Sequence, residues 1–532
     1  ALAAYTRASE QEPDNAMALS SLGMLYLQKQ MPVFAEQALT RANSLSPGKP
    51  ALLRALIQSQ LTQENYAEAE ASVDALLAVQ PNDASSLLLR AQLRQARNEL
   101  AGALDDVQQV MQQHPGHLNA LTLACTLHIQ NGTPDKALTL LENALAADTD
   151  NEALWQLRFG FESSFNPDSQ PFIERWLAQQ PNSAKAHEAY AVMAEGQGRF
   201  GLAAEQADAA LALSEAVPLA HFVKLRQELR ENPAAAKQRL AGLAERAQAP
   251  EAQRMVLGWM GITDDRLGSY AEAAQAFLKM AQFVLPGKTL PTPFPAEQVP
   301  ESDARGHLLW APPGLRIERV LNVLAPILGE RLLADRNQAS AAREDGFGAD
   351  RFAPGTEQAG SALSWRMGIA ALGLQPETCV DWLPHWDAYT SAALQGTRLT
   401  ALVIDPRDAL LNWMVFGSAQ SFVFHPKIKQ AAKWLSVVHH AVADSLEANP
   451  DAVTLLRFDN VDSDAETLAG QLQQALDLPG RPSAEQMAAP VMALGGMPNQ
   501  FPSGHWRHYK NAMADAFEIL TPVAVRLGYP QD

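Results

Sequence analysis

Cysteine is scarce in this sequence, with only Cys125 and Cys379 among 532 residues. Two cysteines are too few for a disulfide framework and lack the spacing of a zinc site, so the sequence predicts a reducing, cytoplasmic compartment. Basic residues are also in the minority, because 41 Lys and Arg face 59 Asp and Glu, a formal net charge of −18. This balance argues against nucleic acid or an anionic membrane as a partner, since both require clustered cations.

Long apolar runs are missing as well. No run reaches the roughly 18 residues that a membrane-spanning helix needs, and the first residues carry no signal-peptide pattern. The chain begins at Ala1 rather than Met, so a removed leader stays open. Apolar residues nevertheless make up 47% of the chain, which excludes a mostly disordered protein.

Proline returns at a fixed interval in the first part of the chain. The step is 34 residues, from Pro13 to Pro47, Pro81 and Pro115, and this interval marks tetratricopeptide repeats. Small residues where two helices cross let their backbones approach closely, and proline stops the second helix of each pair. The positions that follow this register are Leu19, Leu22, Gly23, Tyr26, Leu53, Leu56, Leu87, Ala91 and Leu121 on first helices, and Ala35, Leu39, Ala42, Ala69, Val73, Ala103, Val107, Ala137, Leu141 and Ala144 on second helices.

The register weakens after residue 150 but continues to about residue 283. Trp155 holds a first-helix position, Pro181 closes one unit, and Gly268 marks the turn of the last. We therefore expect residues 1–283 to form about eight helix pairs. Ala1 to Pro13 match only a second helix, so the first helix of that unit is missing from this sequence.

Such an array is a superhelix whose concave face typically binds an extended peptide or a helix of another protein. The sequence therefore predicts a protein or peptide partner on the concave face. In the alternative interpretation, the array only packs against its own C-terminal domain. A role within a larger membrane-associated assembly also stays open, because docking surfaces leave no motif.

Residues 284–305 are rich in proline and poor in bulky apolar residues, which predicts an extended linker. From residue 306 to 532, short apolar runs alternate with helical segments, and this alternation predicts a parallel sheet with helices on both faces. Ligands of such sheets bind at the carboxyl ends of the strands. The expected strands lie in His307–Trp310, Cys379–Leu383, Leu399–Ile404 and Ala452–Phe458.

Four segments of the C-terminal region follow the order found in sulfotransferases. They are Asp381–Pro384, Thr400–Asn412, Leu455–Val461 and Gly504–Tyr509. Together with the repeats, this region resembles the bacterial tetratricopeptide-repeat sulfotransferase family. The resemblance implies an α array followed by an α/β domain with a P-loop-type parallel sheet. It also implies a nucleotide donor, 3′-phosphoadenosine 5′-phosphosulfate.

The resemblance assigns donor-binding roles to specific residues, and several of them depart from the family pattern. The phosphate loop is reduced to Pro312–Arg316, and the family's Arg and Lys fall at Ile404 and Trp382. Losing several charge-assisted phosphate contacts, each worth roughly 1.5–3 kcal/mol, would weaken nucleotide binding by orders of magnitude. The remaining donor-binding candidates are Gly314, Arg316, Arg407, Asn412, Trp506 and Arg507, with Lys510 as a further replacement cation.

Catalytic residues cannot be assigned from a motif. His385 and His425 are the weak candidates for the general base that would deprotonate an acceptor hydroxyl, because imidazole titrates near neutral pH. A surface or capping role is the alternative for each. His439 and His440 lack partners at metal-ligand spacing, so no metal is expected.

Two functions remain open from sequence. In the first, the protein is an adaptor: the repeats bind a protein, and a sulfotransferase-like domain without a working donor site serves as a recognition surface. In the second, the protein is a sulfotransferase that uses the repeats to recruit a protein or peptide acceptor. The first is favoured because a doubly anionic nucleotide prefers a basic cleft, whereas this chain is acidic.

Overall fold

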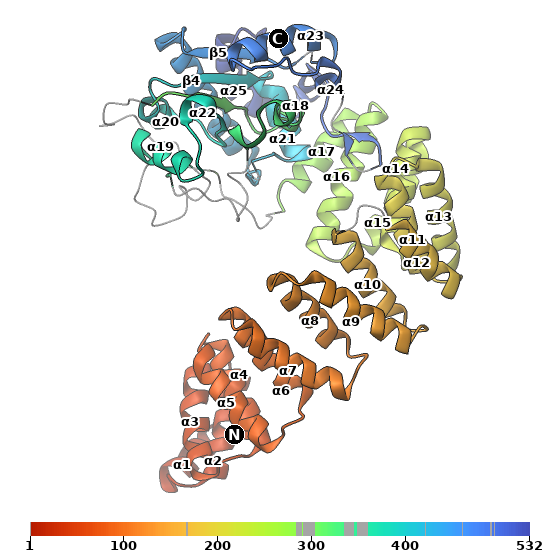
Figure 1. The fold of residues 1–532 in the computed structure, drawn as a ribbon, viewed down its shortest axis with the longest axis vertical. Helices are drawn as coiled ribbons and strands as arrows, with labels where there is room; N and C mark the ends of the chain where they lie inside the picture. Colours follow the sequence, from red (N-terminus) through yellow and green to blue (C-terminus); the bar gives the residue numbers. More distant parts are fainter. Residues whose placement is uncertain are drawn as a thin grey trace. The chain divides into compact units, whose positions relative to one another are not determined.

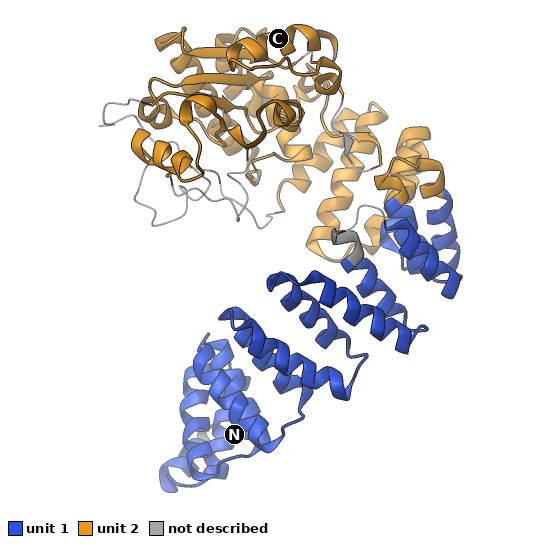
Figure 2. Cartoon of the chain, viewed as in Figure 1, with its two compact units in different colours: residues 1–193, 205–220 blue, residues 194–204, 221–532 orange. Residues whose placement is uncertain are grey.

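The computed structural model contains an all-helical part followed by a part with a small sheet (Figure 1). It forms two compact units, one of residues 1–193 and 205–220 and the other of residues 194–204 and 221–532 (Figure 2). The structure describes all residues except 1, 166–168, 284–289, 291–303, 335–344, 348–359, 421, 460, 490–491 and 494. Most of the expected linker, residues 284–305, lies outside this description.

Within the described residues, seventeen helices precede the first strand, and the early ones keep the expected 34-residue step. A single helix comes first, followed by eight pairs, as the sequence predicts. The helices are α1 (Leu2–Gln11), α2 (Ala16–Gln28), α3 (Pro32–Leu45), α4 (Pro50–Thr62), α5 (Tyr66–Val79), α6 (Ala84–Ala96), α7 (Leu100–Gln113), α8 (Leu118–Gln130), α9 (Pro134–Ala147), α10 (Glu152–Phe165), α11 (Gln170–Gln179), α12 (Ala184–Gly196), α13 (Phe200–Leu213), α14 (Pro218–Glu231), α15 (Pro233–Arg246), α16 (Pro250–Arg266) and α17 (Tyr270–Met280).

Local signals explain where these helices begin and turn. Asn15 and Asp83 cap α2 and α6 by accepting backbone N–H groups, which satisfies donors that the first helical turn leaves unpaired. The turns inside the regular pairs each place one residue in the left-handed region, at the same 34-residue step: Gln30, Glu64, Asn98 and Gly132. The repeat is therefore conserved in backbone conformation even where the residue type varies.

The predicted helix crossings are closely packed. Ala35, Ala69, Ala103 and Ala137 occupy equivalent positions of successive second helices and are fully buried. Opposite Ala35, an added Cβ at Gly23 would lie within 2.7 Å of a Leu39 methyl carbon. Small side chains at these points are required because helix axes can approach closely only where little side chain intervenes.

The second unit contains a parallel sheet, as the sequence predicts, with five strands in the order β2-β3-β1-β4-β5. Four of these strands overlap the expected segments, whereas the two-residue strand β2 was not expected. Its strands are β1 (His307–Trp310), β2 (Leu332–Leu333), β3 (Val380–Trp382), β4 (Arg398–Val403) and β5 (Val453–Arg457). The helices of this region are α18 (Glu318–Leu328), α19 (Ala362–Ala370), α20 (Ala388–Ala393), α21 (Pro406–Phe416), α22 (Ile428–Ala448), α23 (Val461–Ala475), α24 (Ala484–Ala488) and α25 (Ala514–Arg526), with the 3₁₀ segments η1 (Gly329–Arg331), η4 (Pro376–Thr378) and η5 (His505–Tyr509) and the short antiparallel strands β6 (Met492–Ala493) and β7 (Met497–Pro498).

The last repeat pair shares a hydrophobic core with the sheet region. Phe277 of α17 is fully buried and lies 6.2 Å from the ring of Phe501, and Tyr270 stacks at 4.0 Å on His508. Asp265 of α16 accepts hydrogen bonds from Tyr509 at 2.5 Å and contacts His505 at 2.7 Å. Helices α16 and α17 are therefore structurally part of the second unit.

Candidate functional site

In parallel sheets of this kind, ligands bind at the carboxyl ends of the two strands between which the strand order reverses. Here these strands are β1 and β4. After β1, the loop that contains Gly314 packs directly on α21. Gly314 has φ of +90°, and a Cβ at this position would overlap the carbonyl oxygen of Ala409. The loop backbone at Gly314 therefore packs directly against the backbone of α21, and only glycine fits there.

Arg316 is held by the chain's own carbonyl groups. Its Nε donates to the Asn499 carbonyl at 3.1 Å, and an Nη donates to the Phe416 carbonyl at 2.7 Å. Burial lowers the pKa of its guanidinium. Both contacts use N–H groups that a phosphate would otherwise bind.

Arg407 is fully buried and makes five polar contacts within the chain. Its Nε and one Nη donate to the two carboxylate oxygens of Asp405 at 2.9 and 2.7 Å. The Nη groups also donate to the carbonyls of Pro530 at 2.6 Å and Gln531 at 2.8 Å. The Asp405 carboxylate caps α21 by accepting the backbone N–H of Arg407. The guanidinium lies 3.9 Å from the ring centroid of Trp506.

Asn412 and Asp408 on α21 fix the segment that leads into η5. Asn412 accepts the Phe501 N–H at 2.7 Å, while Asp408 accepts the N–H groups of Gly504 at 2.6 Å and Trp506 at 2.9 Å. Burial raises the pKa of Asp408 to about 7, and Asp405 and Asp459 add to this effect. These polar residues of α21 therefore bind backbone from a distant part of the chain.

The remaining donor-site candidates lie around the C-terminus. Trp506 is buried between Arg407 and Arg507, whose guanidinium lies 5.1 Å from its ring centroid. Arg507 is exposed and donates to the Asp532 carbonyl at 2.9 Å, and Lys510 pairs with the Asp532 carboxylate at 2.8 Å. The fold thus brings Arg407, Trp506 and Arg507 together, whereas Arg316 binds elsewhere on α21.

An open cavity of about 370 Å³ lies at the carboxyl ends of β4 and β5. Its lining includes three carboxylates, those of Asp405, Asp459 and Asp464. It includes only two cations, those of Arg457 and Arg507. Arg457 donates to the Leu527 carbonyl at 2.6 Å, and burial raises the pKa of Asp459. The described residues of this cavity therefore do not fit a doubly phosphorylated nucleotide, because carboxylates outnumber cations and each cation already binds a carbonyl.

The candidate bases lie away from this cavity's lining. His385 is buried, stacks on Trp434 and contacts Asp387 at 3.3 Å. His425 is half-buried and accepts the N–H of Lys427 at 3.0 Å. The structure does not bring the two histidines into one polar cluster with Arg407.

His439 is fully buried on α22 and bonds the Leu435 carbonyl through Nδ1 at 2.7 Å. Burial lowers its pKa to about 4. Its neighbour His440 contacts Arg526 at 3.2 Å. Across the residues that the structure describes, no three His, Cys, Asp or Glu side chains are grouped as metal ligands.

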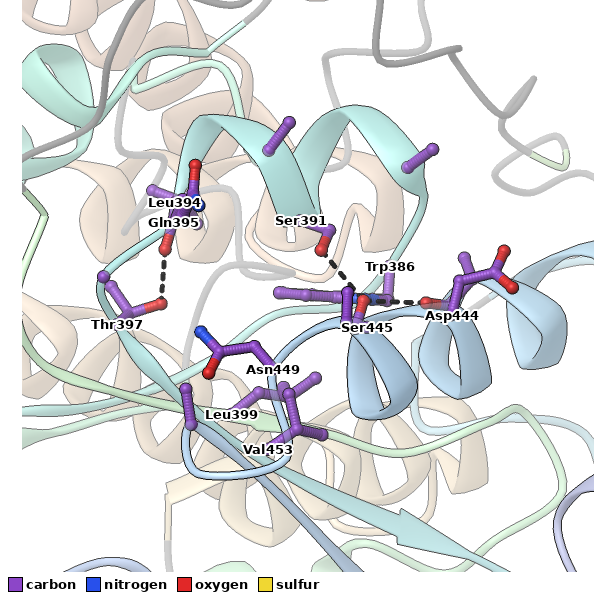
Figure 3. Close-up of a pocket in the computed structure, with 16 residues that line it drawn as sticks. Trp386, Ser391, Leu394, Gln395, Thr397, Leu399, Asp444, Ser445, Asn449 and Val453 are labelled. Atoms are coloured by element: carbon purple, nitrogen blue, oxygen red, sulfur yellow. Dashed lines mark hydrogen bonds between the residues drawn. The ribbon is translucent and has the colours of Figure 1, made fainter.

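A second cavity of the sheet region, of about 380 Å³, lies at the opposite, amino ends of β4 and β5 (Figure 3). Trp386 donates to the Ser445 hydroxyl at 3.1 Å, and Ser391 lies 2.8 Å from the same hydroxyl. Figure 3 shows these two bonds together with the amide of Asn449. The cavity is neutral apart from Asp444, which pairs with Arg526.

The repeats carry a groove of about 590 Å³ between α7 and α9, with α8 at its base. Exposed polar side chains line it, including Gln108, Lys136 and Thr139, beside the apolar Leu104 and Leu140. A neighbouring cavity of about 640 Å³ shares Ala101 and Asn131 with it. The sequence did not predict this groove. Its residues vary from one repeat to the next, so the 34-residue period does not mark them.

Comparisons with known proteins match the repeats. Residues 95–158 match one model of the tetratricopeptide repeat family, and residues 54–117 and 162–218 match another. No curated protein matches the chain, and no helix of the described part is long and apolar enough to cross a membrane.

Solved structures similar to this chain include three repeat proteins. A tetratricopeptide repeat protein from Parabacteroides merdae is 20% identical, with 47% of this chain and 98% of that chain covered and a TM-score of 0.31. MamA is 18% identical; the match covers 27% of this chain and 85% of MamA, with a TM-score of 0.26. YrrB, a repeat protein with an unusual peptide-binding site, is 16% identical, with 42% and 99% covered and a TM-score of 0.25. The family models thus identify tetratricopeptide repeats within residues 54–158 and 162–218 of the helical region that precedes the sheet.

Proposed function

We propose that this protein is an interaction adaptor. Its repeats bind an extended segment of a partner protein, and its sheet region serves as a recognition surface rather than as a catalytic domain. The observation that carries the proposal is the repeat array with its groove between α7 and α9. Stacked repeats characteristically provide extended binding surfaces of this kind.

The chemistry of the groove suits a peptide. Leu104 and Leu140 offer apolar contact, while Gln108, Thr139 and Asn131 offer hydrogen-bond donors and acceptors. Asp105 and Lys136 add one charge of each sign. Such a mixture recognises side chains of moderate polarity and backbone amides, and the groove is within the size range of ligand pockets. The concave face of the array, expected from sequence, stays a prediction.

Exposed apolar side chains support an interaction role for the early repeats. Val33 and Phe34, in the first turn of α3, are 52% and 50% exposed, and Tyr66, the first residue of α5, is 50% exposed. Met31 directly precedes α3. Clusters of exposed large apolar residues commonly mark protein contact sites.

The adaptor role also rests on the carboxyl ends of the strands. Arg316 and Arg407 bind carbonyl and carboxylate groups of the chain itself. A sulfated nucleotide would have to displace these contacts and then approach Asp405 and Asp459. We therefore propose that the sheet region holds no such donor.

The adaptor proposal is tested by selecting peptides from a random library on the full chain and measuring their affinity for two matched variants. Thr139→Trp fills the groove, while Thr126→Trp introduces the same bulk on the exposed side of α8. Both threonines are exposed and donate to a carbonyl four residues earlier, so both variants should fold. We expect Thr139→Trp to weaken binding at least tenfold and Thr126→Trp to leave it unchanged. If instead Thr126→Trp weakens binding and Thr139→Trp does not, the partner binds the exposed side of α8 rather than the groove. If the selection yields no binding peptide, the adaptor proposal is contradicted.

A sulfotransferase that recruits a protein or peptide acceptor is the second candidate. It is favoured by the parallel sheet, whose order reverses between β1 and β4 as in many nucleotide-binding folds. Transfer of labelled sulfate from 3′-phosphoadenosine 5′-phosphosulfate to a selected peptide would establish this activity. Absence of transfer to any peptide that binds the repeats favours the adaptor.

A further inference from the structure

A separate cavity of about 240 Å³ lies within the second unit, between the last repeat pair and α21. Its lining is mostly apolar and rich in methionine, with one cation. The principal side chains are Arg254, Met255 and Trp259 of α16, Met280 of α17, Phe416 of α21, and Met497.

Arg254 is a half-buried cation at the edge of this cavity. In the part of the chain that the structure describes, no hydrogen bond or ion pair reaches its guanidinium, and burial lowers its pKa. Other cations of this helical region are paired: Arg226 with Glu195 at 2.5 Å, and Lys237 with Asp264 at 2.7 Å. A partly desolvated charge is costly unless an opposite charge accompanies it.

The shape of the cavity limits what can fill it. Its volume is below the roughly 300–1,000 Å³ of typical sites for drug-sized ligands, so one aromatic ring or branched alkyl group fits. Thioethers adapt to irregular apolar shapes and contact aromatic rings favourably. Arg254 supplies a planar donor fork that matches a carboxylate in two-bond geometry.

We propose that this cavity binds a small carboxylic acid with an apolar body. The carboxylate pairs with the guanidinium of Arg254, and the apolar body lies among Trp259, Met280 and Met497. The cavity is too small for an extended peptide, and this inference does not depend on the adaptor function. The free-acid group and the apolar body are both required, because the cation and the methionine-rich lining recognise different parts of one molecule.

Isothermal titration of the full chain with 3-phenylpropionate tests this proposal, with 3-phenylpropanamide as the uncharged match. We expect the acid to bind at least tenfold more tightly than the amide, and Arg254→Gln to remove that difference. Arg481→Gln is the control, because Arg481 is exposed and pairs with Glu466 at 2.8 Å far along the sequence. Equal binding of acid and amide, or unchanged binding to Arg254→Gln, would overturn the proposal.

A second variant fills the cavity while keeping the cation. A Cβ at Gly258 would lie 3.0 Å from the flexible thioether of Met280, so Gly258→Val should fold and exclude the apolar body. We expect it to lose acid binding although Arg254 is intact. Unchanged binding to Gly258→Val would place the acid elsewhere. Tighter binding of a hexapeptide ending in Phe than of the free acid would assign the cavity to a peptide terminus and overturn the small-acid assignment.

Discussion

Replacing Arg407 by methionine tests whether this cation stabilises the fold rather than serving a ligand. Methionine keeps an unbranched apolar chain of similar reach but loses the guanidinium. The variant would leave the Asp405 carboxylate without its cation and the carbonyls of Pro530 and Gln531 without their donor. It would also remove the cation from the face of Trp506.

The magnitude follows from burial. Removing one partner of a buried ion pair costs about 3–5 kcal/mol, because the other charge stays desolvated. Arg407 is 0% exposed and Asp405 is 4% exposed, so the range for buried pairs applies. We expect the free energy of unfolding of the second unit to fall by about 3–5 kcal/mol.

Urea unfolding, followed by near-ultraviolet circular dichroism, measures this change against a matched variant. Arg507 contacts the same tryptophan but is exposed, so Arg507→Met should change stability by less than about 1 kcal/mol. If the two variants unfold at the same urea concentration, Arg407 does not stabilise the fold, and the reasoning about this site is wrong.

Three further predictions concern other parts of the chain. Glu64 is exposed with φ of +60°, so Glu64→Gly should raise thermal stability by about 0.5–1 kcal/mol; a lower melting temperature would contradict this. Gly314→Ala should destabilise the second unit by about 2–4 kcal/mol in urea, because its Cβ overlaps the Ala409 carbonyl; an unaffected midpoint would mean that the loop does not pack against α21. Burial raises the pKa of Asp408 to about 7, so its contribution to stability is full below about pH 4 and is lost as pH rises toward 7. Urea midpoints of Asp408→Asn measured from pH 4 to 8 should lack this decline, and an unchanged decline would assign it to other groups.

Periodicity made the repeats predictable because each unit is a local structure that contacts only its neighbours. The interval between prolines predicted second helices through Ala35, Ala69, Ala103 and Ala137, and each of these residues lies in a helix of the structure. The irregular middle was visible as a weakened register, and α11 indeed begins at Gln170 rather than one 34-residue step after Pro134. The strands were predictable for a similar reason, since short buried runs alternate with helices.

The candidate site was less predictable, because its chemistry depends on contacts between distant segments. Arg407 stands beside Asp405 in sequence, and this proximity suggests an ion pair. Its other partners, the carbonyls of Pro530 and Gln531, are more than 100 residues away and are backbone groups without a sequence signature. The shared core of α17 and Phe501 is likewise invisible to any local pattern. The donor-binding roles implied by the sulfotransferase resemblance stay predictions.

The cations at the carboxyl ends of the strands are engaged by the chain itself, and on this ground we propose that the protein binds macromolecules rather than a sulfated nucleotide. Calorimetric titration of the full chain with 3′-phosphoadenosine 5′-phosphate, at low salt to favour phosphate contacts, measures this directly. We expect no saturable heat up to millimolar nucleotide. Saturable micromolar binding that is lost in Arg457→Gln and Arg507→Gln would contradict it.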